Sequence, residues 1–290
     1  MNIFAILENG ELQRLTLSQN IQNELDNFYN TSKEKFLRDK EVINFEGDYK
    51  AGENEIFRID EFNWLGKIKH LEANHRTNVD INNPLQFSQL ENDMIENIKI
   101  LIIDLAHYII FQNVDNRKFI KPRSFLIYSE NTFSFEDRSG IKLDENIDAA
   151  VNKSNGELLF NSFHNASKIF DLSEYYREAT DDEVQNFLGN DLFRLDGNID
   201  INNLNQNIRK KIYLIMKNGA IENIRNNYQT VKDYAISLGL NDCFTDDKIV
   251  IKSGDKKLLK RLIDFLNEDL YKSPISGLIY ASNSKRKVNE

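Results

Sequence analysis

Hydrophobic and polar positions follow strand-like spacing in the first part of the chain. Residues 3–7 and 12–17 predict two short strands around Asn9-Gly10, a pair of residues that favours hairpin turns. Ser18 is then a predicted helix N-cap, because the residues after it place apolar side chains on one helical face. That face consists of Ile21, Leu25, Phe28 and Tyr29.

Short apolar segments separated by polar turns continue to about residue 163 and predict an antiparallel meander. The predicted strands are 42–45, 56–59, 124–128, 132–135, 141–151 and 158–163. The segment from Gln89 to Ile110 is ambiguous, because its second half is a continuous apolar run that fits a buried strand or a buried helix.

After Phe170 the spacing becomes helical. Thr180 and Glu183 have the spacing of a capping box, and further helices are predicted over 204–217 and 221–238. A short strand is expected at 248–251. The last predicted helix has an apolar face formed by Leu258, Leu259, Leu262, Ile263, Leu266 and Leu270. Pro274 and Gly277 end it, and residues 278–281 read as a strand.

These patterns predict an α+β fold, with an antiparallel β-rich N-terminal part packed against a mostly helical C-terminal part. We expect an acidic subdomain over residues 1–170 and a second subdomain over 171–290 that becomes basic toward its end. No linker rich in Pro, Gly or Ser separates them, so packed subdomains are expected in place of tethered domains.

Composition is that of an ordinary globular protein, with 40% hydrophobic and 29% charged residues among 290. The single cysteine, Cys243, excludes an internal disulfide and fits a reducing cytoplasm. The most apolar run, Ile100 to Phe111, is too short to span a bilayer. We therefore expect a cytoplasmic protein without direct membrane insertion.

The net charge of −9 is distributed unevenly along the chain. From Leu204 onward there are 16 Lys and Arg against 10 Asp and Glu, whereas the residues before it carry 21 against 36. Such asymmetry can mark a polyanion-binding half, although solvated lysine-rich helices would produce it too.

Three basic groups and one tyrosine are candidates for nucleic-acid binding, since a phosphate backbone needs several cations spaced along a surface. They are Arg209, Lys210 and Lys211; Lys256, Lys257, Lys260 and Arg261; and Tyr280 with Lys285, Arg286 and Lys287. The structural alternative is a solvated helix face and a C-terminal clasp that pairs with N-terminal carboxylates.

No pattern indicates catalysis, a metal or a cofactor. Asp246-Asp247-Lys248 precedes an apolar strand, but the carboxylates do not alternate with the lysine as a nuclease site requires, and a β-turn explains them. The histidines are scattered, and no glycine-rich phosphate loop occurs. We therefore expect a protein that is not an enzyme, with a metal-dependent nuclease as the alternative.

Three segments, taken in order, resemble the KwaB-like family of the Kiwa anti-phage defence system of bacteria. They are Ser139–Leu143 with Asn146–Val151, Lys168–Tyr176, and the closing helix followed by Ser-Pro-Ile-Ser-Gly, Leu-Ile-Tyr-Ala and Ser-Lys-Arg-Lys. The resemblance covers roughly the last half of the chain, and the first hundred residues match loosely.

The resemblance implies a DNA-binding effector that acts with a membrane-embedded Kiwa partner protein to block phage replication or transcription. It further implies a homodimer that the partner recruits to the inner face of the cell membrane. A third possibility is a pure interaction module that docks on a membrane sensor and does not touch nucleic acid.

Overall fold

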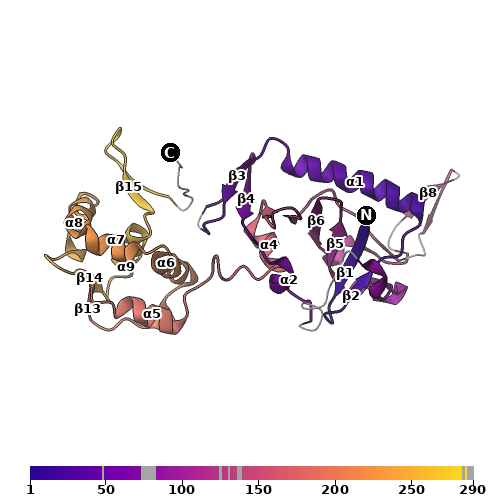
Figure 1. The fold of residues 1–290 in the computed structure, drawn as a ribbon. Coiled ribbons are helices and arrows are strands. Elements are labelled where there is room, and N and C mark those ends of the chain that lie inside the picture. Colours follow the sequence, from indigo (N-terminus) through magenta and orange to yellow (C-terminus); the bar gives the residue numbers. More distant parts are fainter. Residues whose placement is uncertain are drawn as a thin grey trace. The chain divides into compact units, whose positions relative to one another are not determined.

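The computed structural model describes residues 1–47, 49–72, 83–123, 126–129, 131–135, 139–282 and 285. It has the expected mixed α+β fold, which divides into two compact units (Figure 1). The first unit comprises Met1–Phe45 and Ala51–Leu172, and the second comprises Glu46–Lys50 and Ser173–Glu290. Each unit has a hydrophobic core of its own.

An eight-stranded sheet forms the centre of the first unit. In spatial order its strands are β2 (Leu12–Arg14), β1 (Asn2–Leu7), β5 (Ile98–Asp104), β6 (Tyr108–Asn113), β11 (Ala149–Asn152), β12 (Leu158–Phe160), β4 (Glu55–Ile59) and β3 (Glu41–Asn44). All neighbours are antiparallel except β3 and β4. The predicted antiparallel β-rich part is confirmed.

Both faces of this sheet are covered. Helix α1 (Gln19–Leu37) contributes Tyr29 and Phe36 to the core on one face. On the other face, Trp64 of α2 (Trp64–Lys67) contacts Phe111, and Phe163 of α4 (Phe163–Ile169) stacks on Phe45. Burial on both faces explains why β5 appears in the sequence as a continuous apolar run. The second half of the ambiguous segment from Gln89 to Ile110 is therefore β5 and the start of β6, and its first half contains the turn η2.

Shorter elements complete the first unit. Three are 3₁₀ turns, η1 (Pro84–Gln86), η2 (Asn92–Asn97) and η3 (Asn116–Lys118). Strand β7 (Phe119–Ile120) pairs with β10 (Gly140–Ile141), and β8 (Leu126–Ser129) pairs with β9 (Thr132–Phe135) as a separate two-stranded ribbon.

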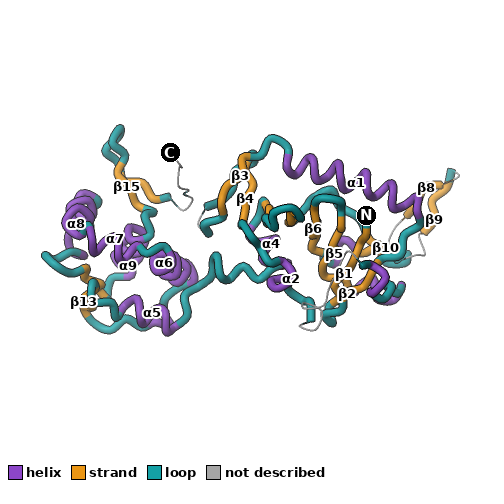
Figure 2. The backbone as a smooth tube through the Cα atoms, in the orientation of Figure 1, coloured by secondary structure: helices purple, strands orange, loops and turns teal. Residues whose placement is uncertain are grey.

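The second unit is mainly helical (Figure 2). Its helices are α5 (Asp181–Leu188), α6 (Gln206–Lys217), α7 (Ala220–Asn226), α8 (Tyr228–Ser237) and α9 (Lys256–Leu266), with the turns η4 (Ile201–Asn203) and η5 (Asn241–Cys243). Strand β13 (Phe193–Asp196) runs parallel to β14 (Ile249–Lys252), and β15 (Leu270–Lys272) forms an antiparallel hairpin with β16 (Ile279–Ala281). The predicted capping box of Thr180 and Glu183 is present.

Two predicted helix boundaries in this unit are wrong. The helix expected over 221–238 is interrupted at Asn227, whose φ of −125° leaves the helical region, so α7 and α8 are separate helices. Helix α9 ends at Leu266, because Glu268 has a φ of 59° that turns the chain, and Leu270 belongs to β15.

Candidate nucleic-acid interface

Helix α9 is the amphipathic helix that its apolar spacing predicts. Asp255 caps its first turn by accepting hydrogen bonds from the backbone N–H groups of Lys257 and Leu258, at 3.0 and 2.9 Å. Its apolar side is buried in the core of the second unit, through Leu259, Leu262, Ile263 and Leu266. The core therefore fixes which side of α9 faces solvent.

The four cations of α9 differ in what they contact. Lys256 and Lys257 are exposed, and neither side chain bonds to any residue that the structure describes. Lys260 is 64% exposed and pairs with Asp264 at 2.6 Å. Arg261 is half-buried and donates to the carbonyl oxygen of Leu238 at the end of α8. Two of the four are thus available to an external anion without breaking an internal contact.

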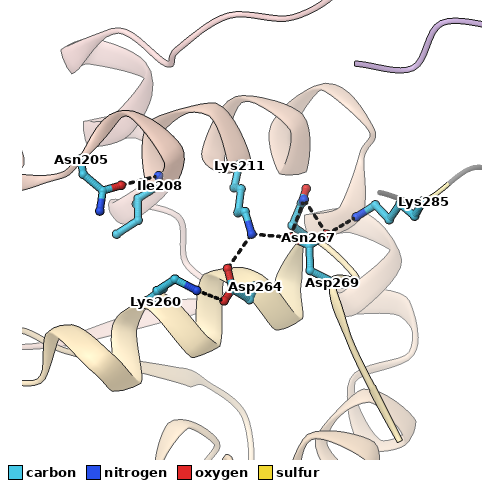
Figure 3. Close-up of polar contacts among 8 residues, drawn as sticks. All are labelled: Asn205, Ile208, Lys211, Lys260, Asp264, Asn267, Asp269 and Lys285. Atoms are coloured by element: carbon cyan, nitrogen blue, oxygen red, sulfur yellow. Dashed lines mark hydrogen bonds and ion pairs between the residues drawn. The ribbon is translucent and has the colours of Figure 1, made fainter. Parts of the chain in front are cut away.

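A cluster of lysines and aspartates lies between α6, α9 and β15 (Figure 3). Asp264 and Asp269 have only 5% and 1% of their surface exposed. The Lys211 Nζ reaches Asp264 Oδ1 at 2.6 Å and Asp269 Oδ2 at 2.5 Å. Lys260 and Lys285 each bind one of the aspartates. We call these five residues the lysine–aspartate cluster, and it holds the two helices and the hairpin together.

Charge pairing in the lysine–aspartate cluster outweighs the effect of burial on ionisation. Burial alone would raise the pKa of Asp264, but hydrogen bonds from Lys211 and Lys260 and their positive charges bring that pKa below its usual value. Burial likewise acts to lower the pKa of Lys211, and its bonds to Asp264 and Asp269 raise that pKa above the usual value. Asp264 and Lys211 are therefore both charged near neutral pH.

The basic triplet on α6 does not form a free cationic face. The Arg209 guanidinium, 15% exposed, pairs with Asp181 at 2.8 Å and donates to the carbonyl oxygens of Ala179 and Ile201. Lys210 Nζ lies 5.5 Å from the centre of the Tyr176 ring, a cation–π contact. Together with Lys211, these residues stabilise the second unit from within.

The C-terminal candidates lie on or near the β15–β16 hairpin. Tyr280 is 42% exposed and stacks on Tyr271 across the two strands. Lys285 pairs with Asp269 at 3.1 Å, so this lysine serves as a clasp for the end of the chain. Arg286 and Lys287 lie outside the described residues.

The two aspartates considered for a nuclease site, Asp246 and Asp247, lie at the surface. Asp246 pairs with Lys232 at 2.9 Å, and Asp247 accepts a hydrogen bond from the hydroxyl group of Thr245. Across the described parts of the chain, no three His, Cys, Asp or Glu side chains are grouped so that they could hold a metal ion. Cys243 is buried, which raises the pKa of its thiol to about 11.

Sequence reasoning did not identify Asp264 and Asp269 as buried residues. Asp264 follows Lys260 by four positions on α9, and this spacing was the available signal for one of its ion pairs. The contacts with Lys211 and Lys285 depend on the tertiary fold.

Comparison with known families decides the identity of the chain. The model of the family described as Kiwa protein KwaB-like matches residues 96–276. The chain belongs to this family. The matched KwaB-like region extends from η2 to the β15–β16 turn and includes α9 and most of the lysine–aspartate cluster. The chain is thus a Kiwa anti-phage defence protein, as the resemblance implied.

No curated protein and no solved structure matches the KwaB-like chain. Among the described residues, no helix has both the length and the apolar character needed to cross a membrane.

Proposed function

We propose that this KwaB-like protein binds DNA without cleaving it, through the phosphate backbone, and that it acts in Kiwa defence with a membrane-embedded partner. The observation that carries the DNA-binding part is the pair Lys256 and Lys257 on α9. Both are exposed, neighbouring and without partners among the described residues, in the part of the chain that carries excess positive charge.

Phosphate binding by such lysines does not depend on base sequence, because the energy comes from neutralised phosphates and released counterions. The acidic first unit opposes indiscriminate association with polyanions. Local binding by α9 combined with repulsion elsewhere orients the protein on the duplex. Protein held on phage DNA in this way would obstruct replication or transcription.

A charge-matched pair of variants tests the site. We expect Lys256→Gln/Lys257→Gln to weaken binding to all duplex sequences alike. The slope of log affinity against log salt concentration should become shallower by about 0.9 for each phosphate that the protein no longer neutralises. The control, Lys35→Gln/Lys168→Gln, removes the same charge from exposed positions of α1 and α4. A salt slope equal in both double variants would contradict the assignment of α9.

One observation favours the interaction module as a second candidate. The β8–β9 ribbon places Leu126, Tyr128, Phe133 and Phe135 on one face, and these side chains are 53–66% exposed. Exposed apolar surface of this kind is typical of protein interaction sites. If the module is right, Phe133→Ser/Phe135→Ser should abolish co-purification with the membrane protein encoded alongside, whereas the α9 variant should not.

The assembly part of the proposal is a homodimer bound to the membrane-embedded partner, and it rests on membership in the KwaB-like family. Light scattering of the purified protein should give twice the mass of 33.9 kDa. A mass equal to one chain over the micromolar range would contradict the homodimer.

A further inference from the structure

A cavity of about 470 Å³ opens on the second unit between α7, α8 and the segment that joins α9 to β15. Its size falls within the range of ligand pockets for small molecules. The apolar part of its wall comes from Ala220, Ile224, Val231, Phe265, Leu266 and Leu270. The β15–β16 hairpin, which extends away from the helices in Figure 2, contributes Tyr271.

Two tyrosines bring aromatic surface to this pocket. The Tyr271 ring is stacked against Tyr280, with ring centres 5.6 Å apart and planes inclined by 21°. Tyr234 accepts a hydrogen bond through its hydroxyl group from the backbone N–H of Lys272 at 3.0 Å, which fixes the hairpin against α8. The Tyr271 and Tyr234 side chains are about half exposed, at 46% and 42%. The aromatic surface is therefore held in place and accessible.

Three polar side chains at the pocket have unused hydrogen-bonding capacity. The Asn223 amide, the Thr230 hydroxyl and the Glu268 carboxylate line the cavity, and none of these side chains bonds to a described residue. Glu268 is notable for its backbone, since its φ of 59° lies in the left-handed region that favours glycine. A carboxylate at a position where glycine fits better indicates a role beyond folding.

We propose that this pocket binds an unpaired nucleobase of DNA, stacked on the tyrosines, with Glu268 accepting a hydrogen bond from the exocyclic amino group of the base. Aromatic side chains stack on any base, and carboxylates accept from the amino group of cytosine. The proposal rests on the DNA binding proposed above and names the form of DNA preferred. It predicts that the protein favours DNA with an extruded base.

The position of the pocket along α9 agrees with this ligand. Lys256 and Lys257 begin the helix, and Phe265 and Leu266 end it at the pocket. Its 11 residues span about 16 Å, which is the length of about five base steps of a duplex. One DNA molecule can therefore place phosphates at one end of the helix and a base at the other.

An apolar side chain from a protein would suit the pocket less well. It would cover Glu268 and Asn223 without offering them hydrogen-bond partners, and burying such groups unsatisfied is costly. A nucleobase offers donors and acceptors along its edge while presenting a flat face to the tyrosines.

Fluorescence anisotropy with the full chain and three otherwise identical labelled duplexes tests the proposal. One duplex is fully paired, one carries an extrahelical cytosine, and one carries an extrahelical abasic site as the control for bending. We expect the cytosine duplex to bind at least about fivefold more tightly than the other two. Replacing the cytosine by thymine, which lacks the amino group, should reduce this gain, and Glu268→Gln should remove the difference between the two bases.

A pair of tryptophan variants assigns the gain to the pocket. Thr230 is an exposed residue of α8 in the pocket wall, so Thr230→Trp should fill the cavity and abolish the preference for the extrahelical base. Asn226→Trp, at an exposed position of α7 outside the pocket, should retain it.

The possible results distinguish the base pocket from the DNA binding proposed above. Equal affinity for the three duplexes, with salt-sensitive binding retained, overturns the base pocket and leaves the proposed function intact. Failure to bind any duplex overturns both. If the preference for the extrahelical base survives in Thr230→Trp, base recognition lies elsewhere and the pocket proposal is overturned. If Thr230→Trp loses a protein partner that the other variants keep, the pocket binds a protein and the proposal is likewise overturned.

Discussion

At the scale of single residues, identical lysines have different roles that depend on contacts distant in sequence. Lys211 and Lys256 are both members of basic runs, and the sequence makes both candidates for phosphate binding. In the fold, Lys211 meets two buried aspartates, 53 and 58 residues away, whereas Lys256 remains in solvent. Composition predicts where positive charge accumulates, but it cannot predict which cations the core has already neutralised.

The stabilising role of the lysine–aspartate cluster can be tested at Lys211. Lys211→Met should lower the free energy of unfolding by about 2–3 kcal/mol, because Asp264 and Asp269 each lose a charged hydrogen bond in a buried site but keep another lysine. Urea denaturation measures the change. Lys256→Met is the control and should change stability by less than about 0.5 kcal/mol. Equal stabilities for the two variants would show that the lysine–aspartate cluster does not hold the fold.

Glu183 provides a pH-dependent contribution to stability. The pKa of Glu183 is lowered from an ordinary value of 4.5 to about 2, mainly because the Arg177 side chain donates hydrogen bonds to its carboxylate. A carboxyl group whose pKa is lowered in the folded protein stabilises the fold at pH values above its ordinary pKa. This contribution is lost as the pH falls toward the pKa of the folded protein.

We therefore expect Glu183→Gln to cost about 1 kcal/mol near neutral pH and little near pH 2, because the neutral amide can keep the capping box but loses the charged hydrogen bonds with Arg177. Denaturation curves of both proteins across this pH range measure it. A difference that stays constant with pH would mean that the charge of Glu183 contributes nothing.

At the scale of elements, periodicity was informative wherever an element is exposed on one side. The apolar face of α9 and the capping box of α5 follow from local spacing, and the structure has them. Of the face predicted for α1, Leu25, Phe28 and Tyr29 pack on the core, whereas Ile21 is 42% exposed. Elements decided by tertiary contacts were missed or ambiguous. Strand β5 is buried on both faces, and β13 pairs with β14 across a stretch that contains three helices.

The end of α9 allows a test at this scale. Glu268 is the residue just after the C-cap and has a left-handed backbone, so Glu268→Gly should relieve strain. We expect a gain of about 0.5–1 kcal/mol and a rise in Tm of about 2–4 °C. Thermal unfolding followed by circular dichroism measures this rise. An unchanged or lower Tm would contradict the role assigned to backbone strain in this turn.

At the scale of the whole molecule, the two units differ in architecture and in charge. The first is built on a sheet covered on both faces and lies in the acidic part of the sequence, and the second is mainly helical and includes the segment from Leu204 onward, in which Lys and Arg outnumber Asp and Glu. The sequence predicted the α+β fold with its antiparallel N-terminal part, and the family. It could not show that much of the second unit's positive charge is used internally, which concentrates the candidate DNA contacts on the outer face of α9 and the adjoining pocket.

The most direct test of DNA binding is the electrophoretic mobility of linear double-stranded DNA mixed with the purified full-length protein. It is run at low and at physiological salt, each with and without magnesium. We expect a shift that weakens as salt rises and DNA that stays intact under all four conditions. DNA that does not shift at low salt, or that is degraded only when magnesium is present, would contradict it.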